Sequence, residues 1–183
     1  MPAERWLQNG RRYLIRSIHP WEHQILVTLR LLEGPDCDDL SLLFEEMQTH
    51  YTVFCPPRET IVANLRNLPA GTEVLVATNV DRIVAFAAFS TVFPGPGLKP
   101  GFFLKELFVS KSQRGVGIGK QLLQALGAFC LERGLGRVDW TADRTDAPLL
   151  NFYDNLGATR KEDKLFYRLD GHALKELASE SVK

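Results

Sequence analysis

The chain has 183 residues, a length that makes one domain and buries a core without disulfides or metals. Apolar residues make up 45% of the chain and charged residues 24%, which excludes a disordered or disulfide-rich protein. Lysine and arginine total 22, and so do aspartate and glutamate, so no net positive field draws the chain to nucleic acid or to an anionic membrane. We therefore expect a folded protein with no nucleic-acid and no membrane partner.

The cysteines and histidines do not form a metal-binding or disulfide pattern. Cys37, Cys55 and Cys130 are odd in number and lack the short spacing of metal ligands. The four histidines show no H-E-x-x-H spacing. The first 16 residues lack the apolar stretch of a secretory signal, and no run approaches about 18 apolar residues. We expect reduced thiols, no metal and a cytoplasmic protein.

Hydrophobic periodicity predicts alternating strands and helices. Residues 1–23 form an extension with a short strand in the apolar run 13–18. Further along we expect a strand at 24–33, helices at 36–51 and 59–68, a hairpin of strands at 72–78 and 82–93, a loop at 94–101, a strand at 102–109, a long helix ending near residue 133, a strand at 138–142, a helix at 147–156, a strand at 164–169 and a helical tail at 172–178. This order predicts a mixed α/β domain.

The glycine-rich stretch QRGVGIGK at residues 113–120 is the most informative local signal. It joins an apolar strand to an amphipathic helix. Such a turn gathers unpaired backbone N–H groups at the positive end of the helix dipole, which makes a site for a pyrophosphate. Arg114 and Lys120 add positive charge on either side of it. A helix cap built from glycines, without a ligand, is the structural alternative.

Two other phosphate-binding motifs are excluded by the residues present. A Walker loop requires Ser or Thr after Gly119-Lys120, where this chain has Gln121. A dinucleotide fingerprint requires a third glycine at the position of Leu122. The glycine turn therefore belongs to a different class of phosphate site.

The pattern R-x-x-G-x-G after a strand ending in Leu-Phe-Val, with F-Y-x-x-x-G-A downstream, resembles the GNAT superfamily of acyl-CoA N-acyltransferases. The stretches ELFVSKSQRGVGIGKQLL (106–123), VDWTA (138–142) and NFYDNLGA (151–158) carry this resemblance. Within the superfamily they look most like the branch of diamine (spermidine/spermine) and thialysine acetyltransferases. The resemblance implies an α/β GNAT fold, in which helices flank a mixed central sheet with splayed parallel strands.

The resemblance also implies a domain organisation and a partner. It covers residues 24–171, which leaves residues 1–23 as an N-terminal extension and residues 172–183 as a helical tail. Members of the related branch dimerise through their last strands and C-terminal segment. We therefore expect a homodimer.

Acetyl-CoA is the cosubstrate that the resemblance implies. It would lie in a gap between residues 104–109 and 138–142, with its pantetheine hydrogen-bonded to the main chain of the first strand and its pyrophosphate on the glycine turn. The implied cofactor-binding residues are Phe108, Val109, Arg114, Gly115, Val116, Gly117, Ile118, Gly119, Lys120 and Asn151.

The acceptor amine sets the chemical requirement for catalysis. An ammonium with a pKa of about 10.4 is roughly three units above neutral pH, so freeing the amine costs about 4–5 kcal/mol. Glu106 is the candidate for the base or for the start of a water chain. Tyr153 stands at the family's position for the acid that protonates the leaving thiolate. The alternatives are a surface ion pair for Glu106 and core packing for Tyr153.

The candidate acceptor-binding residues depart from the polyamine pattern. Lys105 stands where that branch has an acid, and His50-Tyr51 replaces a Tyr-Glu pair at the end of the first helix. We expect an N-acetyltransferase that acts on a primary amine of a small molecule by direct attack in a ternary complex. A catalytically weak CoA-binding or sensing module, and an acetyltransferase of a protein or peptide amine, are the alternatives.

Overall fold

The chain divides into two units, residues 1–140 and residues 141–183, and the first unit is built around a mixed sheet. The computed structural model describes residues 12–14 and 27–180. Within these, the sheet has the spatial order β1 (Arg12–Leu14), β2 (Thr28–Leu31), β3 (Thr72–Asn79), β4 (Arg82–Val92), β5 (Gly101–Val109) and β6 (Val138–Trp140). Neighbouring strands are antiparallel except β5 and β6, which are parallel. The expected mixed sheet is confirmed.

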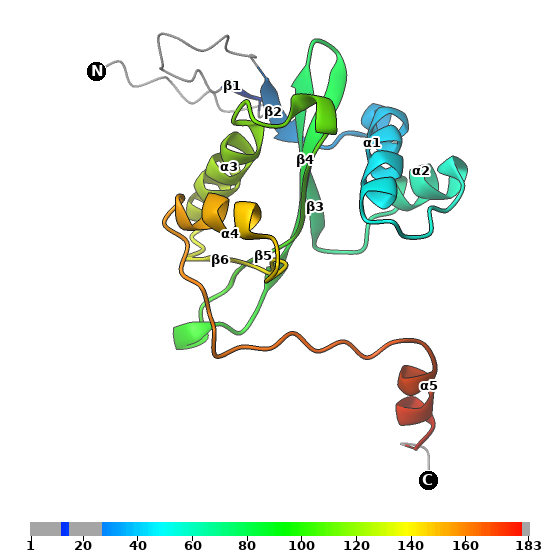
Figure 1. Cartoon of the computed structure of the whole chain (residues 1–183), viewed down its shortest axis with the longest axis vertical. Coiled ribbons are helices and arrows are strands. Elements are labelled where there is room, and N and C mark those ends of the chain that lie inside the picture. The colour runs from blue at the N-terminus through cyan, green and yellow to red at the C-terminus, as the bar shows by residue number, and fades with distance from the viewer. Residues whose placement is uncertain (1–11, 15–26, 181–183) are drawn as a thin grey trace. The chain divides into compact units, whose positions relative to one another are not determined.

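Helices cover both faces of this sheet (Figure 1). The helices α1 (Cys37–His50) and α2 (Arg58–Arg66) lie on one face, and α3 (Ile118–Glu132) lies on the other. Successive side chains of a strand point to opposite faces of the sheet, which separates the two cores. On β3, Val74 and Val76 pack with α1 and α2, whereas Leu75 and Ala77 pack with α3. Each layer therefore buries its own apolar stripe.

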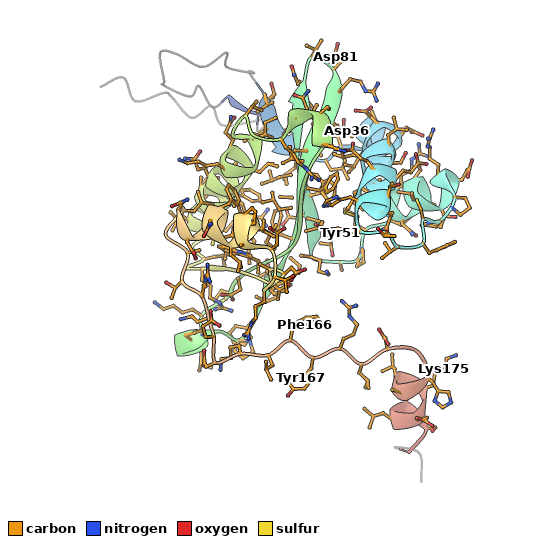
Figure 2. All side chains as sticks on the ribbon, in the orientation of Figure 1. Asp36, Tyr51, Asp81, Phe166, Tyr167 and Lys175 are labelled. Carbon is orange, nitrogen blue, oxygen red and sulfur yellow. The ribbon has the colours of Figure 1, made fainter. Side chains whose placement is uncertain are left out.

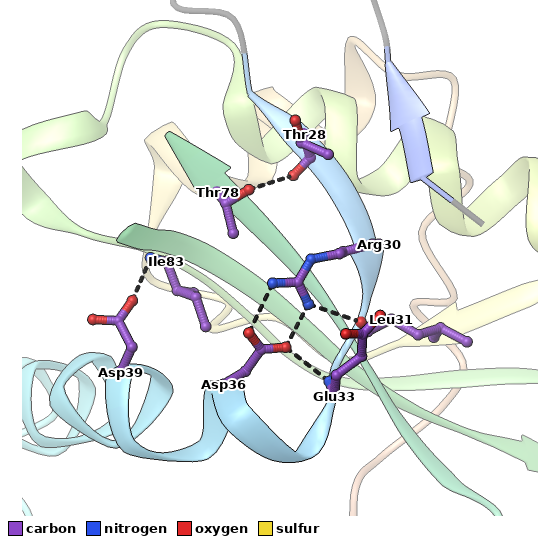
Figure 3. A network of polar contacts seen from close by, with 8 residues as sticks. All are labelled: Thr28, Arg30, Leu31, Glu33, Asp36, Asp39, Thr78 and Ile83. Carbon is purple, nitrogen blue, oxygen red and sulfur yellow. Dashed lines mark hydrogen bonds and ion pairs between the residues drawn. The ribbon is translucent and has the colours of Figure 1, made fainter. Parts of the chain in front are cut away.

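A polar network joins the start of α1 to the sheet (Figure 3). The Arg30 guanidinium on β2 makes a two-point contact with the Asp36 carboxylate, with Nη2 and Oδ1 2.7 Å apart. The backbone N–H of Glu33 donates to the same carboxylate at 2.8 Å. Asp39, one turn further along, accepts from the Ile83 N–H on β4 at 2.6 Å. The first turn of α1 is thereby held to both β2 and β4.

A bulge at Lys105 changes the direction of the side chains along β5. Ala88 pairs with Glu106 and Phe89 pairs with Leu104, so Lys105 is an extra residue on β5. Phe102 and Leu104 pack on the α3 side, whereas Phe108 packs on the α1 side. In a regular strand these even-numbered residues would share one face. The bulge therefore turns Glu106 and Phe108 toward α1.

The parallel pairing of β5 with β6 covers only the first part of β5. It joins Phe102 to Val138 and Leu104 to Trp140, and β6 ends there. The pairing of β5 with β4 continues to Val109. The second half of β5 therefore has one paired edge and one edge that β6 does not reach.

The second unit contains α4 (Ala147–Asp154) and α5 (Gly171–Glu180). The Asp146 carboxylate caps α4 by accepting from the Leu149 N–H at 2.9 Å. The strand predicted at 164–169 is wrong, because this segment has no regular structure in the described chain. Its side chains are typical of a strand, but within the described residues its backbone has no neighbouring strand to pair with.

The remaining boundaries differ by a few residues. The strand predicted at 24–33 is only β2, because Gly34 to Asp36 form a 3-10 turn that starts the first helix, and residues 24–26 lie outside the described part. The strand predicted at 138–142 ends at Trp140. The helical tail is confirmed as α5. The short strand predicted at 13–18 is described only at its start, within β1. In the described ranges no helix combines the length and apolar character needed to span a membrane.

We expect Asp36→Asn to destabilise the fold in a pH-dependent way. The hydrogen-bonded Arg30 guanidinium is the main cause that lowers the pKa of Asp36 below its usual 3.8. The stabilisation from the ionised carboxylate is therefore complete above that usual value and disappears as the pH falls through the lowered pKa. Urea unfolding should show a loss of about 1.5–3 kcal/mol at pH 7.

The matched control is Asp38→Asn, which removes an exposed carboxylate that contacts Arg66 at 2.9 Å. An exposed pair contributes only about 0–1 kcal/mol, so this variant should unfold nearly like the parent. A loss for Asp36→Asn that is the same at acidic and neutral pH would contradict the proposed role of its charge.

Candidate active site

The glycine turn between β5 and α3 has a backbone that glycine favours. Gly115 has φ +82° and Gly117, the N-cap of α3, has φ +85°. These are left-handed conformations, which cost about 1–2 kcal/mol for residues with a Cβ. A Cβ at either position would meet no atom within 4 Å, so there is open space above the turn. The turn thus combines backbone amides with room for a ligand.

The N-terminus of α3 supplies the donors of this turn. The first bond of the helical ladder runs from the Gln121 N–H to the Gly117 carbonyl. The amides of Ile118, Gly119 and Lys120 come before that bond and have no acceptor within the helix. Together with the helix dipole they form a site suited to an anion. Gly115, Val116 and the exposed Lys120 are in the same turn, as the sequence predicted.

Arg114 lies against the end of β5. Its Nε donates to the Val109 carbonyl at 3.0 Å, and its guanidinium carbon is 5.3 Å from the centre of the Phe108 ring. These contacts hold a positive charge beside the glycine turn. The predicted contribution of Arg114 to an anion site is therefore compatible with its position.

The main-chain groups on the open edge of β5 follow from its register. The Ser110 N–H donates to the Val84 carbonyl on β4 at 2.9 Å. Because main-chain groups alternate between the two edges of a strand, those of Phe108 also face β4. Those of Leu107 and Val109 face the edge that β6 does not reach. Sequence reasoning named Phe108 and missed Leu107.

Glu46 on α1 holds the segment that leads into the glycine turn, and sequence reasoning missed it as well. Its carboxylate accepts from the Lys111 backbone N–H at 2.6 Å and from the Ser110 hydroxyl at 2.9 Å. Only the helical period places Glu46 on the same side of α1 as buried Leu43, three residues before it, and no motif marks it. Through these hydrogen bonds, α1 holds the start of the glycine turn in place.

The Glu106 carboxylate meets the end of α1. The Tyr51 hydroxyl donates to Glu106 Oε1 at 2.7 Å, and Tyr51 is the C-cap residue of α1 (Figure 2). The His50 ring lies 5.2 Å from the Tyr51 ring and 5.9 Å from the Phe108 ring, measured between centroids. The structure therefore brings Glu106, Tyr51 and His50 together. Lys105, the residue before Glu106, is exposed at the bulge.

The two remaining predicted residues, Asn151 and Tyr153, lie on α4 in the second unit. The Tyr153 ring is 5.2 Å from the Phe152 ring, and its carbonyl accepts from the N–H groups of Leu156 and Ala158 at 3.1 and 3.3 Å. The Asn151 carbonyl accepts from the Asn155 N–H at 3.0 Å. The roles of both residues remain predictions.

The buried cysteines are unsuited to nucleophilic chemistry. Burial is the main cause that raises the pKa of the Cys37 and Cys130 thiols, which keeps them protonated at neutral pH. Among the described residues no group of three or more His, Cys, Asp or Glu side chains is arranged to hold a metal ion. A cavity of about 460 Å³ between β2, α1, α2 and β3 is lined by none of the predicted site residues.

Comparison with known proteins connects the chain to a family of acetyltransferases. Residues 40–158 match the model of the acetyltransferase (GNAT) family. The L-ornithine N5-acetyltransferase of Arabidopsis thaliana is 33% identical over 98 residues, a match that spans 53% of this chain and 43% of that protein.

Solved structures share the fold. An integron cassette protein from the mobile metagenome of V. cholerae superposes with a TM-score of 0.77 at 31% identity, covering 83% of this chain and 97% of its own. An aminoglycoside acetyltransferase from an uncultured soil metagenomic sample has a TM-score of 0.65 at 23% identity, covering 79% and 97%. A ribosomal-protein-alanine N-acetyltransferase from Brucella melitensis has a TM-score of 0.64 at 20% identity, covering 78% and 98%.

We expect Gly117→Ala to weaken binding of coenzyme A. A Cβ at φ +85° forces the N-cap out of its conformation, and the cost of about 1–2 kcal/mol corresponds to a roughly 5- to 30-fold loss of affinity. Titration calorimetry with coenzyme A measures the affinity.

Gly127→Ala on the same helix is the matched control. Its Cβ also meets nothing within 4 Å, but its φ is not left-handed, so the change should stabilise α3 by about 0.5–1 kcal/mol and leave the affinity unchanged. Equal affinities for the two variants would contradict a role for the turn in binding.

Proposed function

Because the chain belongs to the GNAT acetyltransferase family, we propose that its domain of residues 24–171 transfers the acetyl group of acetyl-CoA to a primary amine of a small molecule. The amine attacks directly in a ternary complex of enzyme, acetyl-CoA and acceptor. The observation that carries the proposal is the open edge of β5, which leads directly into an anion-binding turn.

The residues on this edge fit the two ends of acetyl-CoA. Its extended pantetheine arm has amide groups that pair with the Leu107 main chain and the Val109 N–H, as an added strand would, while the Val109 carbonyl accepts from Arg114. This assignment replaces Phe108, whose main-chain groups face β4. The pyrophosphate is bound by the N-terminal amides of α3, with Arg114 and Lys120 beside them. Acetyl-CoA supplies the acetyl group as a thioester.

Glu106 is the base in this proposal. The bulge at Lys105 and the hydrogen bond from Tyr51 hold its carboxylate on the α1 side of β5. It takes one proton from the acceptor ammonium, directly or through a water, as the amine nitrogen forms its bond to the thioester carbon. No covalent acyl-enzyme is involved, in agreement with the raised pKa of the two buried thiols.

Tyr153 is the acid in this proposal. The carbon–sulfur bond breaks as the amide forms, and the phenol gives its proton to the leaving thiolate. The nitrogen then loses its second proton to the phenolate, which restores Tyr153. A phenol with a pKa near 10 is protonated at neutral pH, as this role requires. The support for the assignment is the place of Tyr153 in the segment Asn151-Phe152-Tyr153 of the family motif.

A small-molecule acceptor is supported by the relative that the chain resembles in sequence. That protein is named for acetylation of an amine on ornithine, a free amino acid. The two structural neighbours with named acceptors, at 23% and 20% identity, share the fold only and do not bear on the acceptor.

Calorimetry and turnover test the proposed function together. Acetyl-CoA should bind in the micromolar range, and free adenosine should bind far more weakly. When a panel of primary amines is incubated with acetyl-CoA, mass spectrometry should detect acetylated products.

Tyr153→Phe should lower kcat at least 10-fold with less than 2-fold change in acetyl-CoA affinity, as expected for general acid catalysis worth about 10²–10⁴-fold.

Two results would contradict the proposed function. Acetyl-CoA binding with hydrolysis but no acetylated amine would favour a sensing module. A Tyr153→Phe variant that loses affinity and turnover equally would favour a packing role for this ring.

We also propose that the protein is a homodimer through its C-terminal segment. Three consecutive large side chains there are exposed: Leu165 by 71%, Phe166 by 65% and Tyr167 by 84%. α5 adds half-exposed leucines at positions 174 and 177, which are one helical turn apart. An exposed apolar run of this kind is typical of a protein–protein interface.

Analytical ultracentrifugation tests the dimer. The full chain should sediment as a dimer at micromolar concentration, and the double variant Leu165→Ser/Phe166→Ser should be monomeric because it removes apolar contact area. Lys175→Ala, on exposed α5, is the control and should remain dimeric. A monomeric parent protein would contradict the proposed dimer.

A further inference from the structure

We propose that Tyr51 is a positioning residue for Glu106, and that the acceptor is an amine with a single positive charge on an apolar body. This inference rests on the proposed function. Three observations support it: the contact between the end of α1 and the middle of β5, the hydrogen bonds that already occupy the carboxylates of α1, and the apolar residues that follow Tyr51.

The contact joins two elements that are each fixed independently. The Tyr51 N–H donates to the Met47 carbonyl at 3.0 Å, which holds Tyr51 on the last turn of α1. Glu106 is held by the pairing of β5 with β4 at the bulge. The hydrogen bond of 2.7 Å between the two side chains therefore sets the rotamer of the carboxylate. A base that is already oriented loses less entropy on reaching the transition state.

The same hydrogen bond occupies one of the two carboxylate oxygens. Oε1 of Glu106 accepts from Tyr51, and within the described residues no hydrogen bond to Oε2 is found. One carboxylate oxygen is thus available to an ammonium group. A phenol donor beside it adds no charge, so the pair matches one positive charge.

The other carboxylates of α1 already have partners in the described chain. Glu45 accepts from two nitrogens of Arg58 at 2.9 and 2.7 Å, and Glu46 holds Ser110 and Lys111. At the far end of the helix, the two aspartates accept from arginines at 2.9 and 2.7 Å: Asp38 from Arg66 and Asp39 from Arg82. Glu106 is the only acid on β5. A second or third ammonium of a polyamine would find no unpaired acid on these two elements.

The residues around the pair also disfavour a polycation. Lys105 is adjacent to Glu106 in sequence and is exposed, so it adds positive charge near the acceptor side. The His50 ring lies near both the Tyr51 and the Phe108 ring and contributes an aromatic surface. Like charges brought together weaken binding, whereas an apolar group against aromatic rings strengthens it.

The α1–α2 loop that begins at Tyr51 is apolar and exposed. Val53 is 52% exposed and Phe54 is 85% exposed, and the Val53 N–H donates back to the Gln48 carbonyl at 3.1 Å. The loop therefore stays close to the end of α1, two and three residues from the phenol that contacts Glu106. Apolar side chains next to a few polar groups are typical of a ligand site. We assign this surface to the apolar body of the acceptor.

The experiment compares kcat/KM for 2-phenylethylamine, hexylamine, putrescine and spermidine with saturating acetyl-CoA. The two monoamines should exceed spermidine by at least 10-fold. Spermidine equal to or better than the monoamines would overturn the proposed substrate class and leave the acetyltransferase function standing. If none of a wider set of primary amines were acetylated, the proposed function itself would fail.

A double-mutant cycle tests the positioning role. Tyr51→Phe keeps the ring and removes the hydroxyl, so kcat should fall about 5- to 20-fold with unchanged acetyl-CoA affinity and melting temperature. In the Glu106→Gln background the same change should have less than a 2-fold effect, because there is no base left to orient. Equal effects in the two backgrounds would overturn the role of Tyr51.

The control for this cycle removes another hydroxyl at the same helix end. The Thr49 hydroxyl donates to the Glu45 carbonyl within α1 at 2.9 Å and not to Glu106. Thr49→Val should therefore leave kcat within 2-fold of the parent. A loss as large as that of Tyr51→Phe would indicate a general disturbance of α1 and would overturn the specific role of the phenol.

Discussion

The whole site depends on the difference between the two edges of β5. One edge pairs with β4 to the end of the strand, whereas β6 accompanies the other edge only as far as Leu104. Polar main-chain groups need partners, so the uncovered main chain of Leu107 and N–H of Val109 form a place where a ligand with amide groups is favoured. The bulge at Lys105 turns Glu106 to the opposite face. In our proposal the same strand offers its edge to acetyl-CoA and a carboxylate to the acceptor amine.

The glycine turn was predictable from sequence, whereas the contact between Tyr51 and Glu106 was not, although both residues were named as candidates. The turn at residues 113–120 follows from local rules, because glycines, a preceding strand and a following helix are sufficient to indicate an anion site. The hydrogen bond between Tyr51 and Glu106 joins residues 55 positions apart, which no local pattern encodes. The bulge had a weak signal, since Lys105 and Glu106 are two polar residues inside an apolar strand. The segment 164–169 has the composition of a strand, but composition does not supply a pairing partner.

The fold does not determine the acceptor. Structures named for acetylation of aminoglycosides and of a ribosomal protein share this architecture at 23% and 20% identity. We propose that in this chain the features that select an acceptor are concentrated at the end of α1 and in the loop after it. There the carboxylates of α1 serve to hold arginines and the glycine-turn segment, which leaves a single acid to recognise an amine. In this proposal the charge preference for the acceptor depends on the ion pairs and hydrogen bonds that already occupy the carboxylates of α1.

Amide hydrogen exchange measured by NMR, with and without acetyl-CoA, tests the central claim most directly. The open edge predicts that the Leu107 and Val109 amides exchange fast in the free protein and become at least 10-fold slower in the complex, together with those of Ile118, Gly119 and Lys120. The Phe108 amide, which faces β4, should be slow in both states. Unchanged exchange at Leu107 and Val109 in the saturated complex would contradict the account.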